Sequence, residues 1–267
     1  MQNQTQPLKK EPKETPKAKR KRLRQEAKQR DMIAAYESPI YNGLEKPFAN
    51  GISANKLLFL FVIGGVLGFV FESIWCPLTT GHFEVRTGLV IGMFIPVYGL
   101  GAVALTVCLH RLYKSRDLLI FLSSAVIGGV VEYLTSMFQE LIFGTISWDY
   151  SNTQFNFGGR TNLTYSFVWG ILGIVWVKDW YPAASKLIER IPKKIGNLAA
   201  RVLLIALVLD ILLSAAAVTR KAERYDSKPA SNSFAVFLDQ HFGDDYLDFV
   251  FPNMKFTKQE KSRMVAG

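Results

Sequence analysis

Apolar residues are concentrated in five runs, which are separated by short polar connections. A helix needs about 20 apolar residues to cross the ~30 Å hydrocarbon core of a membrane, and each run reaches that length. The runs are Leu57–Cys76, Gly88–Leu109, Leu118–Phe143, Asn162–Tyr181 and Leu198–Val218. The pattern therefore predicts an all-α membrane protein with five transmembrane helices.

The pentapeptide Val-Ile-Gly-Gly-Val occurs twice, at Val62–Val66 in the first run and at Val126–Val130 in the third. The similarity continues beyond it, because Phe83–Thr87 and Phe157–Thr161 share the pattern Phe-x-x-Arg-Thr before the next run begins. The first and third runs cross the membrane in the same direction, so the copies are parallel rather than inverted repeats. We expect two parallel helical-hairpin repeats followed by a fifth span.

Each copy carries a glutamate inside its apolar run, Glu72 in the first and Glu132 in the third. A carboxylate in a membrane span costs roughly 2.5–3.5 kcal/mol on insertion scales, so it marks a paired structural group or a functional pocket. At about 1.5 Å per residue, the two glutamates lie at nearly the same depth in the outer half. Gly64 and Gly68 share the helix face of Glu72, and small residues let helices pack closely. Two interpretations stay open: a packing seam held by polar groups, and a cavity into which both carboxylates point.

Arg86 and Arg160 lie at the outer ends of the second and fourth spans, within snorkelling reach of the two glutamates. We expect two Glu–Arg pairs, Glu72 with Arg86 and Glu132 with Arg160. Pro96 lies in the middle of the second run and predicts a bent helix there.

The N-terminal tail is strongly basic. Residues 1–30 hold eleven lysines and arginines against three glutamates, and so carry +8 of the formal net charge of +10. Nucleic-acid binding is one interpretation; beside a membrane span we favour a topogenic signal that contacts anionic lipid, with no specific nucleic-acid partner. The connections at 110–116 and 186–194 are also basic, so the positive-inside rule places them and the N-terminus in the cytoplasm.

These observations divide the chain into three parts. Residues 1–56 form a basic tail and juxtamembrane segment, predicted to be disordered because the tail has little apolar content. Residues 57–218 form the transmembrane domain, and residues 219–267 form a C-terminal extramembrane segment on the outer side. Arg220, Lys221 and Arg224 argue against that placement. The acidic residues between Asp239 and Asp248 do not have the spacing of a calcium loop, so we predict no metal site.

The stretch from Gly128 to Trp169 is the most distinctive in the chain. It contains Glu-Tyr-Leu-Thr-Ser, Trp-Asp-Tyr-Ser, Asn-x-x-Gly-Arg and Trp-Gly, at Glu132–Ser136, Trp148–Ser151, Asn156–Arg160 and Trp169-Gly170. With Pro-Val-Tyr-Gly at Pro96–Gly99, these motifs resemble the ABC-transporter type IV permease family of bacterial multi-pass membrane proteins. The resemblance covers about residues 57–252 and implies a permease in the bacterial cell (plasma) membrane.

These motifs and the repeat supply the candidate site residues. Asp149 is placed to pair with Arg160 or to cap a turn, and Trp148 suits an interfacial aromatic belt. The candidates for substrate binding or ion coupling are Glu72, Glu132, Arg86, Arg160, Glu140, Asp149, Tyr98 and Trp148.

The sequence favours a transporter component embedded in the lipid bilayer. It has no Gly-x-x-x-x-Gly-Lys-Ser/Thr loop, so an ATPase that drives transport must be a separate subunit. One alternative is a membrane enzyme acting on lipid or envelope precursors, with Glu72 or Glu132 as acid or base. No nucleophile–base pair accompanies them, so we assign no catalytic residue and no cofactor and favour a non-enzyme. The other alternative is a non-catalytic membrane scaffold.

Overall fold

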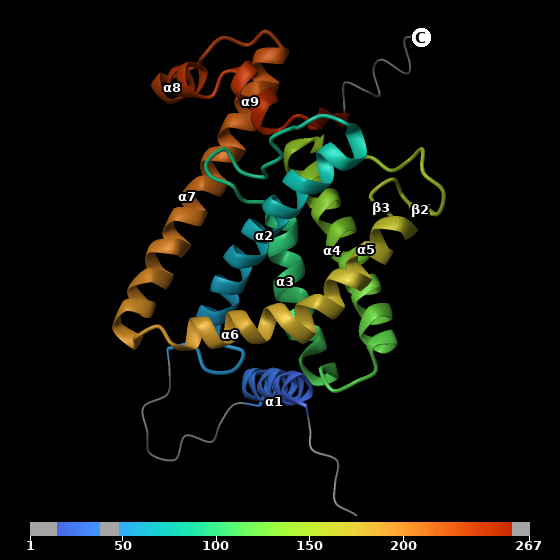
Figure 1. Cartoon of the computed structure of the whole chain (residues 1–267). Coiled ribbons are helices and arrows are strands. Elements are labelled where there is room, and N and C mark those ends of the chain that lie inside the picture. The colour runs from blue at the N-terminus through green and yellow to red at the C-terminus, as the bar shows by residue number, and fades with distance from the viewer. Residues whose placement is uncertain (1–14, 38–47, 258–267) are drawn as a thin grey trace, which may run out of the picture.

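The computed structural model describes residues 15–37 and 48–257, and this part of the chain is mostly helical (Figure 1). Three helices are long and apolar enough to cross a membrane: α2 (Ala54–Thr80), α4 (Asp117–Phe143) and α7 (Lys193–Tyr225). They coincide with the first, third and fifth apolar runs. The second and fourth runs contain shorter helices, α3 (Pro96–Leu109) and α5 (Leu163–Val175).

The second run is helical only in its latter part. Pro96 is the first residue of α3, where its missing N–H costs nothing, so the predicted mid-helix bend is wrong. Before it, residues 88–95 form a non-helical loop in which Gly92 has a φ of +87°. Two side chains of α7 satisfy backbone N–H groups of this loop: Ser214 Oγ accepts from Val90 at 2.9 Å, and Asp210 Oδ1 accepts from Ile91 at 3.2 Å. Buried backbone N–H groups outside a helix require internal partners of this kind.

The fourth run continues beyond α5. A five-residue π-helix, Trp176–Trp180, leads into α6 (Tyr181–Glu189), and α6 lies across one end of the upright helices (Figure 1). We call this end, which also holds the 3-10 turn His110–Leu112 after α3, the α6 end.

Part of the basic tail is ordered. Residues Pro16–Tyr36 form α1, which begins with a Thr15 cap and lies below α6 in Figure 1. Its end is anchored by Tyr36, whose hydroxyl donates to the Val177 carbonyl at 2.9 Å, and Lys186 of α6 pairs with Asp31 at 2.8 Å. The prediction of disorder is therefore wrong for residues 16–36. Residues 1–14 and 38–47 of the tail lie outside the described part of the chain.

Glycines bring the upright helices together in two antiparallel pairs, α2 with α3 and α4 with α5. A Cβ on Gly64 would lie 2.5 Å from Ala102 Cβ of α3, and one on Gly128 would lie 2.1 Å from Trp169 Cγ of α5. Only hydrogen atoms fit at these positions, so the expected small-residue packing seam is present in both pairs.

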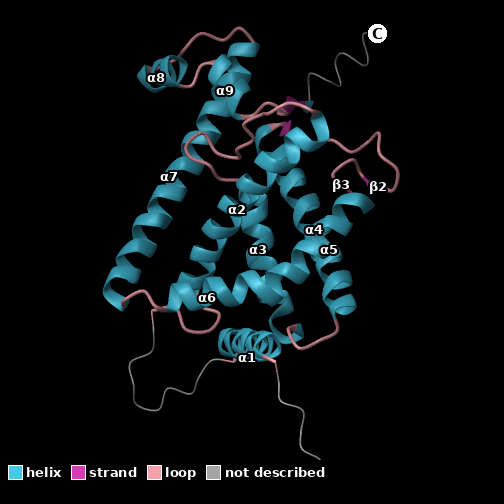
Figure 2. Ribbon diagram, viewed as in Figure 1, coloured by secondary structure: helices cyan, strands magenta, loops and turns pink. Residues whose placement is uncertain are grey.

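The opposite end carries the loops and two short antiparallel ladders (Figure 2). In the first ladder, β1 (Thr145–Ile146) pairs with β4 (Lys255–Phe256); in the second, β2 (Asn156–Phe157) pairs with β3 (Thr161–Asn162). Beyond α7, α8 (Ser233–His241) and α9 (Asp244–Val250) lead to β4. The C-terminal segment thus returns to the loops that follow α4. We call this the ladder end.

Candidate functional site

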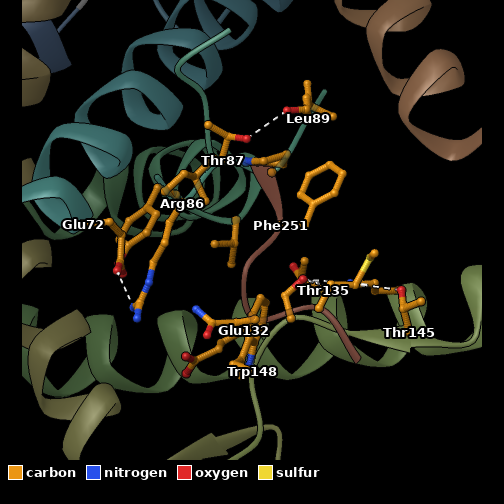
Figure 3. Close-up of a pocket in the computed structure, with 18 of the residues that line it drawn as sticks. Glu72, Arg86, Thr87, Leu89, Glu132, Thr135, Thr145, Trp148 and Phe251 are labelled. Carbon is orange, nitrogen blue, oxygen red and sulfur yellow. Dashed lines mark hydrogen bonds and ion pairs between the residues drawn. The ribbon is translucent and has the colours of Figure 1, made fainter. Parts of the chain in front are cut away.

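A cavity of ≈ 680 Å³ lies toward the ladder end of the helices. Its walls come from α2, α3, α4, α5 and α7, and residues 251–255 of the C-terminal segment contribute to its lining. Figure 3 shows Glu72 and Glu132 with Arg86, Trp148 and Phe251 around this space. The walls are predominantly apolar, as in most small-molecule sites, and both glutamates line them.

Two side chains contact the carboxylate of Glu72, one from α3 and one from the loop that precedes α3. The hydroxyl of Tyr98, on α3, donates to Glu72 Oε1 at 2.7 Å, and Arg86 Nη1 lies 3.4 Å from Oε2. The predicted Glu72–Arg86 pair is therefore confirmed. Arg86 also donates to a second carboxylate, that of Glu84, through Nε at 3.0 Å and Nη2 at 2.9 Å. Two carboxylates thus share one guanidinium.

The cluster extends outward to an imidazole. His82 Nε2 lies 2.8 Å from Glu84 Oε1, and the side chain of His82 is 62% exposed. The nearby carboxylate raises the pKa of His82, while His82 and Arg86 lower the pKa of Glu84. A chain of charged contacts therefore joins the solvent to the cavity wall.

Glu132 has a different environment. It is only 6% exposed, and its two carboxylate oxygens accept hydrogen bonds from Tyr150 at 3.0 Å and Thr161 at 2.8 Å. Both donors are neutral hydroxyl groups. Among the described residues, no arginine or lysine forms a salt bridge with Glu132, so the predicted pair with Arg160 is wrong.

Arg160 instead turns to the next residues along the same face of α4. It pairs with the carboxylate of Glu140, and its Nη1 donates to Ser136 Oγ at 3.1 Å. The Trp148 indole donates to the Arg160 carbonyl at 2.8 Å and so fixes the loop around it. Counted from the repeated pentapeptide, Ser136 stands where Glu72 stands in the first copy, and Glu132 stands one helical turn earlier.

Asp149 caps a turn, which was one of its two predicted roles. Its Oδ1 accepts from the backbone N–H of Ser151 at 2.9 Å and from the Ser151 hydroxyl at 2.6 Å. These hydrogen bonds lower the pKa of the Asp149 carboxyl. The turn holds the neighbouring Tyr150 where it can reach Glu132.

Six of the eight candidate residues line the cavity: Glu72, Arg86, Tyr98, Glu132, Trp148 and Asp149. Arg160 and Glu140 do not, and pair with each other beside it. The sequence interpretation missed the partners Tyr150 and Thr161, although both lie inside motifs that it singled out. It also missed the contribution of residues 251–255, for which the sequence carries no periodic signal.

The arrangement is suited to binding. Two carboxyl groups face an apolar, aromatic-walled space, and among the described residues Glu132 is held by neutral hydroxyls without a basic partner. Within the described residues, no group of three or more His, Cys, Asp or Glu side chains is placed to hold a metal ion.

The model of a family described as "Putative ABC-transporter type IV" matches residues 59–215. This match begins within α2 and ends within α7, and so covers at least part of every helix that lines the cavity. Searches of the curated proteins and of the solved structures found no match.

Proposed function

The chain belongs to this ABC-transporter type IV family, and from that membership we propose that it is the membrane-embedded permease component of an ABC-type transporter. Its solute would pass through the cavity that Glu72 and Glu132 line. The cavity itself carries the proposal, because a scaffold gains nothing from a ≈ 680 Å³ space lined by a buried carboxyl group, that of Glu132.

We propose a multi-pass topology with five spans for this permease in a bacterial plasma membrane. α3 and α5 then serve as the second and fourth spans, and α2–α3 and α4–α5 are parallel hairpin repeats. The α6 end faces the cytoplasm, since it carries α1 and the basic connections, and the ladder end faces outward. In this topology the exposed basic face of α1 lies against anionic lipid headgroups.

A separate ATPase subunit must supply the energy, because the chain contains no phosphate-binding loop. The test is purification of the tagged full chain from its native membrane in mild detergent. We expect a nucleotide-binding subunit in stoichiometric amount. Its absence, together with normal growth of cells carrying Glu72→Gln and Glu132→Gln in a correctly folded protein, would overturn the proposal.

A matched control separates loss of transport from loss of assembly. Glu132→Gln should retain the ATPase subunit and lose its biological activity. Glu37→Gln makes the same chemical change on an exposed side chain at the α6 end, outside the cavity, and should retain both.

A further inference from the structure

Aromatic side chains dominate the wall of the cavity around the glutamates. The Tyr98 and Trp169 ring centroids lie 5.6 Å apart, and Tyr150 stacks on Tyr165 at 4.7 Å. Six of the lining aromatic residues come from α2, α3, α5 and the loop after α4: Trp75, Tyr98, Trp148, Tyr150, Tyr165 and Trp169. The faces of such rings carry negative charge density and attract organic cations, tryptophan most strongly.

The formal charges of the wall are negative in balance. Three carboxylates line it, those of Glu72, Glu132 and Asp149, against two basic side chains, Arg86 and Lys255. Arg86 contributes no free positive charge, because it is shared between Glu72 and the additional carboxylate of Glu84. At Arg86, an anionic ligand would therefore meet a guanidinium that is already neutralised.

Glu132 supplies the specific contact. It is more than nine-tenths buried and lines the cavity, and both of its hydrogen bonds come from neutral hydroxyls. Away from water, a charge interacts with an opposite charge much more strongly than it does in solvent. A cation that enters the cavity would supply the missing partner.

The apolar extent of the wall argues against a small inorganic cation. Such an ion needs several oxygen ligands at close range, whereas Phe71, Phe138, Val168 and Leu172 are typical of the remaining lining. A volume of ≈ 680 Å³ lies within the range of about 300–1,000 Å³ that suits drug-sized organic molecules.

We propose that the cavity binds a monovalent organic cation with bulky apolar or aromatic substituents, whose charged centre lies next to Glu132. The inference rests on the proposed function in taking this cavity as the solute site, and it names the chemical class of the solute.

Two ions of the same shape and opposite charge test it: tetraphenylphosphonium and tetraphenylborate. The full chain is placed in nanodiscs of zwitterionic phosphatidylcholine, and saturable quenching of tryptophan fluorescence is measured. Three of the five tryptophans of the chain line the cavity and report on it: Trp75, Trp148 and Trp169. We expect the phosphonium to bind at least tenfold more tightly than the borate.

Variants locate the binding. Glu132→Gln should weaken phosphonium binding at least tenfold, whereas Glu37→Gln, which makes the same change at the α6 end, should leave it within about twofold. The comparison of the two ions uses the unaltered chain, and so remains decisive if Glu132→Gln does not fold.

Each outcome has a distinct meaning. Binding of the borate as tightly as the phosphonium overturns the assignment of a cation and leaves the cavity as a solute site. Saturable binding of neither ion overturns the assignment and removes the support that the cavity gives to a permease. Binding of the phosphonium without a copurifying ATPase subunit supports the cation site and argues against the proposed transporter.

Discussion

Gly128 on α4 and its neighbour Gly129 offer a direct test of how the helices pack. A Cβ on Gly128 would lie 2.1 Å from Trp169 Cγ and 2.4 Å from its Cβ. The other edge of the indole packs closely against Gly101 of α3, where an added Cβ would lie only 2.5 Å from the ring. The indole therefore has no room to move away from Gly128. Gly129 differs, since the nearest atom to its Cβ would be the Ser166 hydroxyl at 3.1 Å, and that group can rotate away.

These contacts set the expected magnitudes. Overpacking a close interface costs about 1–3 kcal/mol, and the cost at Gly128 should be near the upper end because helix backbones must separate. Both substitutions to alanine gain roughly 1 kcal/mol of helix propensity. We therefore expect Gly128→Ala to lower the free energy of unfolding by about 2 kcal/mol, whereas Gly129→Ala changes it by about zero to +1 kcal/mol.

Thermal unfolding of the purified full chain in one detergent, followed by tryptophan fluorescence, measures the difference. Each kcal/mol shifts the melting temperature by about 2–4 °C in a chain of this size, so the two variants should differ by about 4–12 °C. A Gly128→Ala protein that melts at or above the temperature of Gly129→Ala would refute the packing described for Trp169.

Three further predictions concern ion pairs. Lys56 is fully buried and pairs with Glu189. Glu189→Gln leaves that buried charge without its partner and should lower the free energy of unfolding by about 3 kcal/mol, whereas Lys56→Met removes the buried charge and should lower it by less than about 1 kcal/mol. Equal losses of unfolding free energy for the two variants in chemical denaturation would contradict this. An NMR titration should give His82 a pKa above its ordinary 6.5, and Glu84→Gln should return it toward that value. The His82–Glu84 pair therefore contributes fully to folding stability between pH 4.5 and 6.5. This contribution is lost above the raised pKa of His82 and below the lowered pKa of Glu84. A His82 pKa at its ordinary value would contradict the contact. Asp239 of α8 accepts hydrogen bonds from the 4% exposed Arg220 of α7 through both carboxylate oxygens, at 2.9 Å each. Asp239→Asn should therefore loosen α8 and accelerate limited proteolysis of the α7–α8 connection several-fold. An unchanged cleavage rate would show that this contact does not hold α8.

The membrane-spanning core could be predicted from apolar content alone, as α2, α4 and α7 show. The second run could not, because an apolar stretch does not distinguish a helix from extended backbone. Pro96 disfavours helical backbone at Ile95, and the residues before it form a loop. Two N–H groups of that loop, those of Val90 and Ile91, find their acceptors on α7, far away in the sequence.

Several of the residues that line the site could be predicted from the sequence, but most of the contacts between them could not. Glu132 and Glu140 share one face of α4, so spacing alone left Arg160 with two candidate partners. Its choice depends on Tyr150 and Thr161, whose hydroxyls occupy both oxygens of Glu132. The paths of these loops depend on two-residue ladders, one local and one to residues 255–256, and strands this short give no periodic signal in a sequence.

The difference between the two hairpins is what gives the cavity its chemistry. In the α2–α3 pair, Arg86 forms a salt bridge with Glu72. In the α4–α5 pair, Arg160 contacts Ser136, which lies at the same distance from the repeated pentapeptide as Glu72 does in the first copy. Because the second glutamate stands one turn earlier, beyond this arginine, hydroxyls hold it, and no basic side chain of residues 15–37 or 48–257 forms a salt bridge with it. Exact symmetry would have produced two neutral pairs and a purely structural seam. A displacement of one helical turn leaves one buried carboxyl group without a salt bridge among the described residues, which is why we expect substitutions at Glu132 and Glu72 to have different consequences.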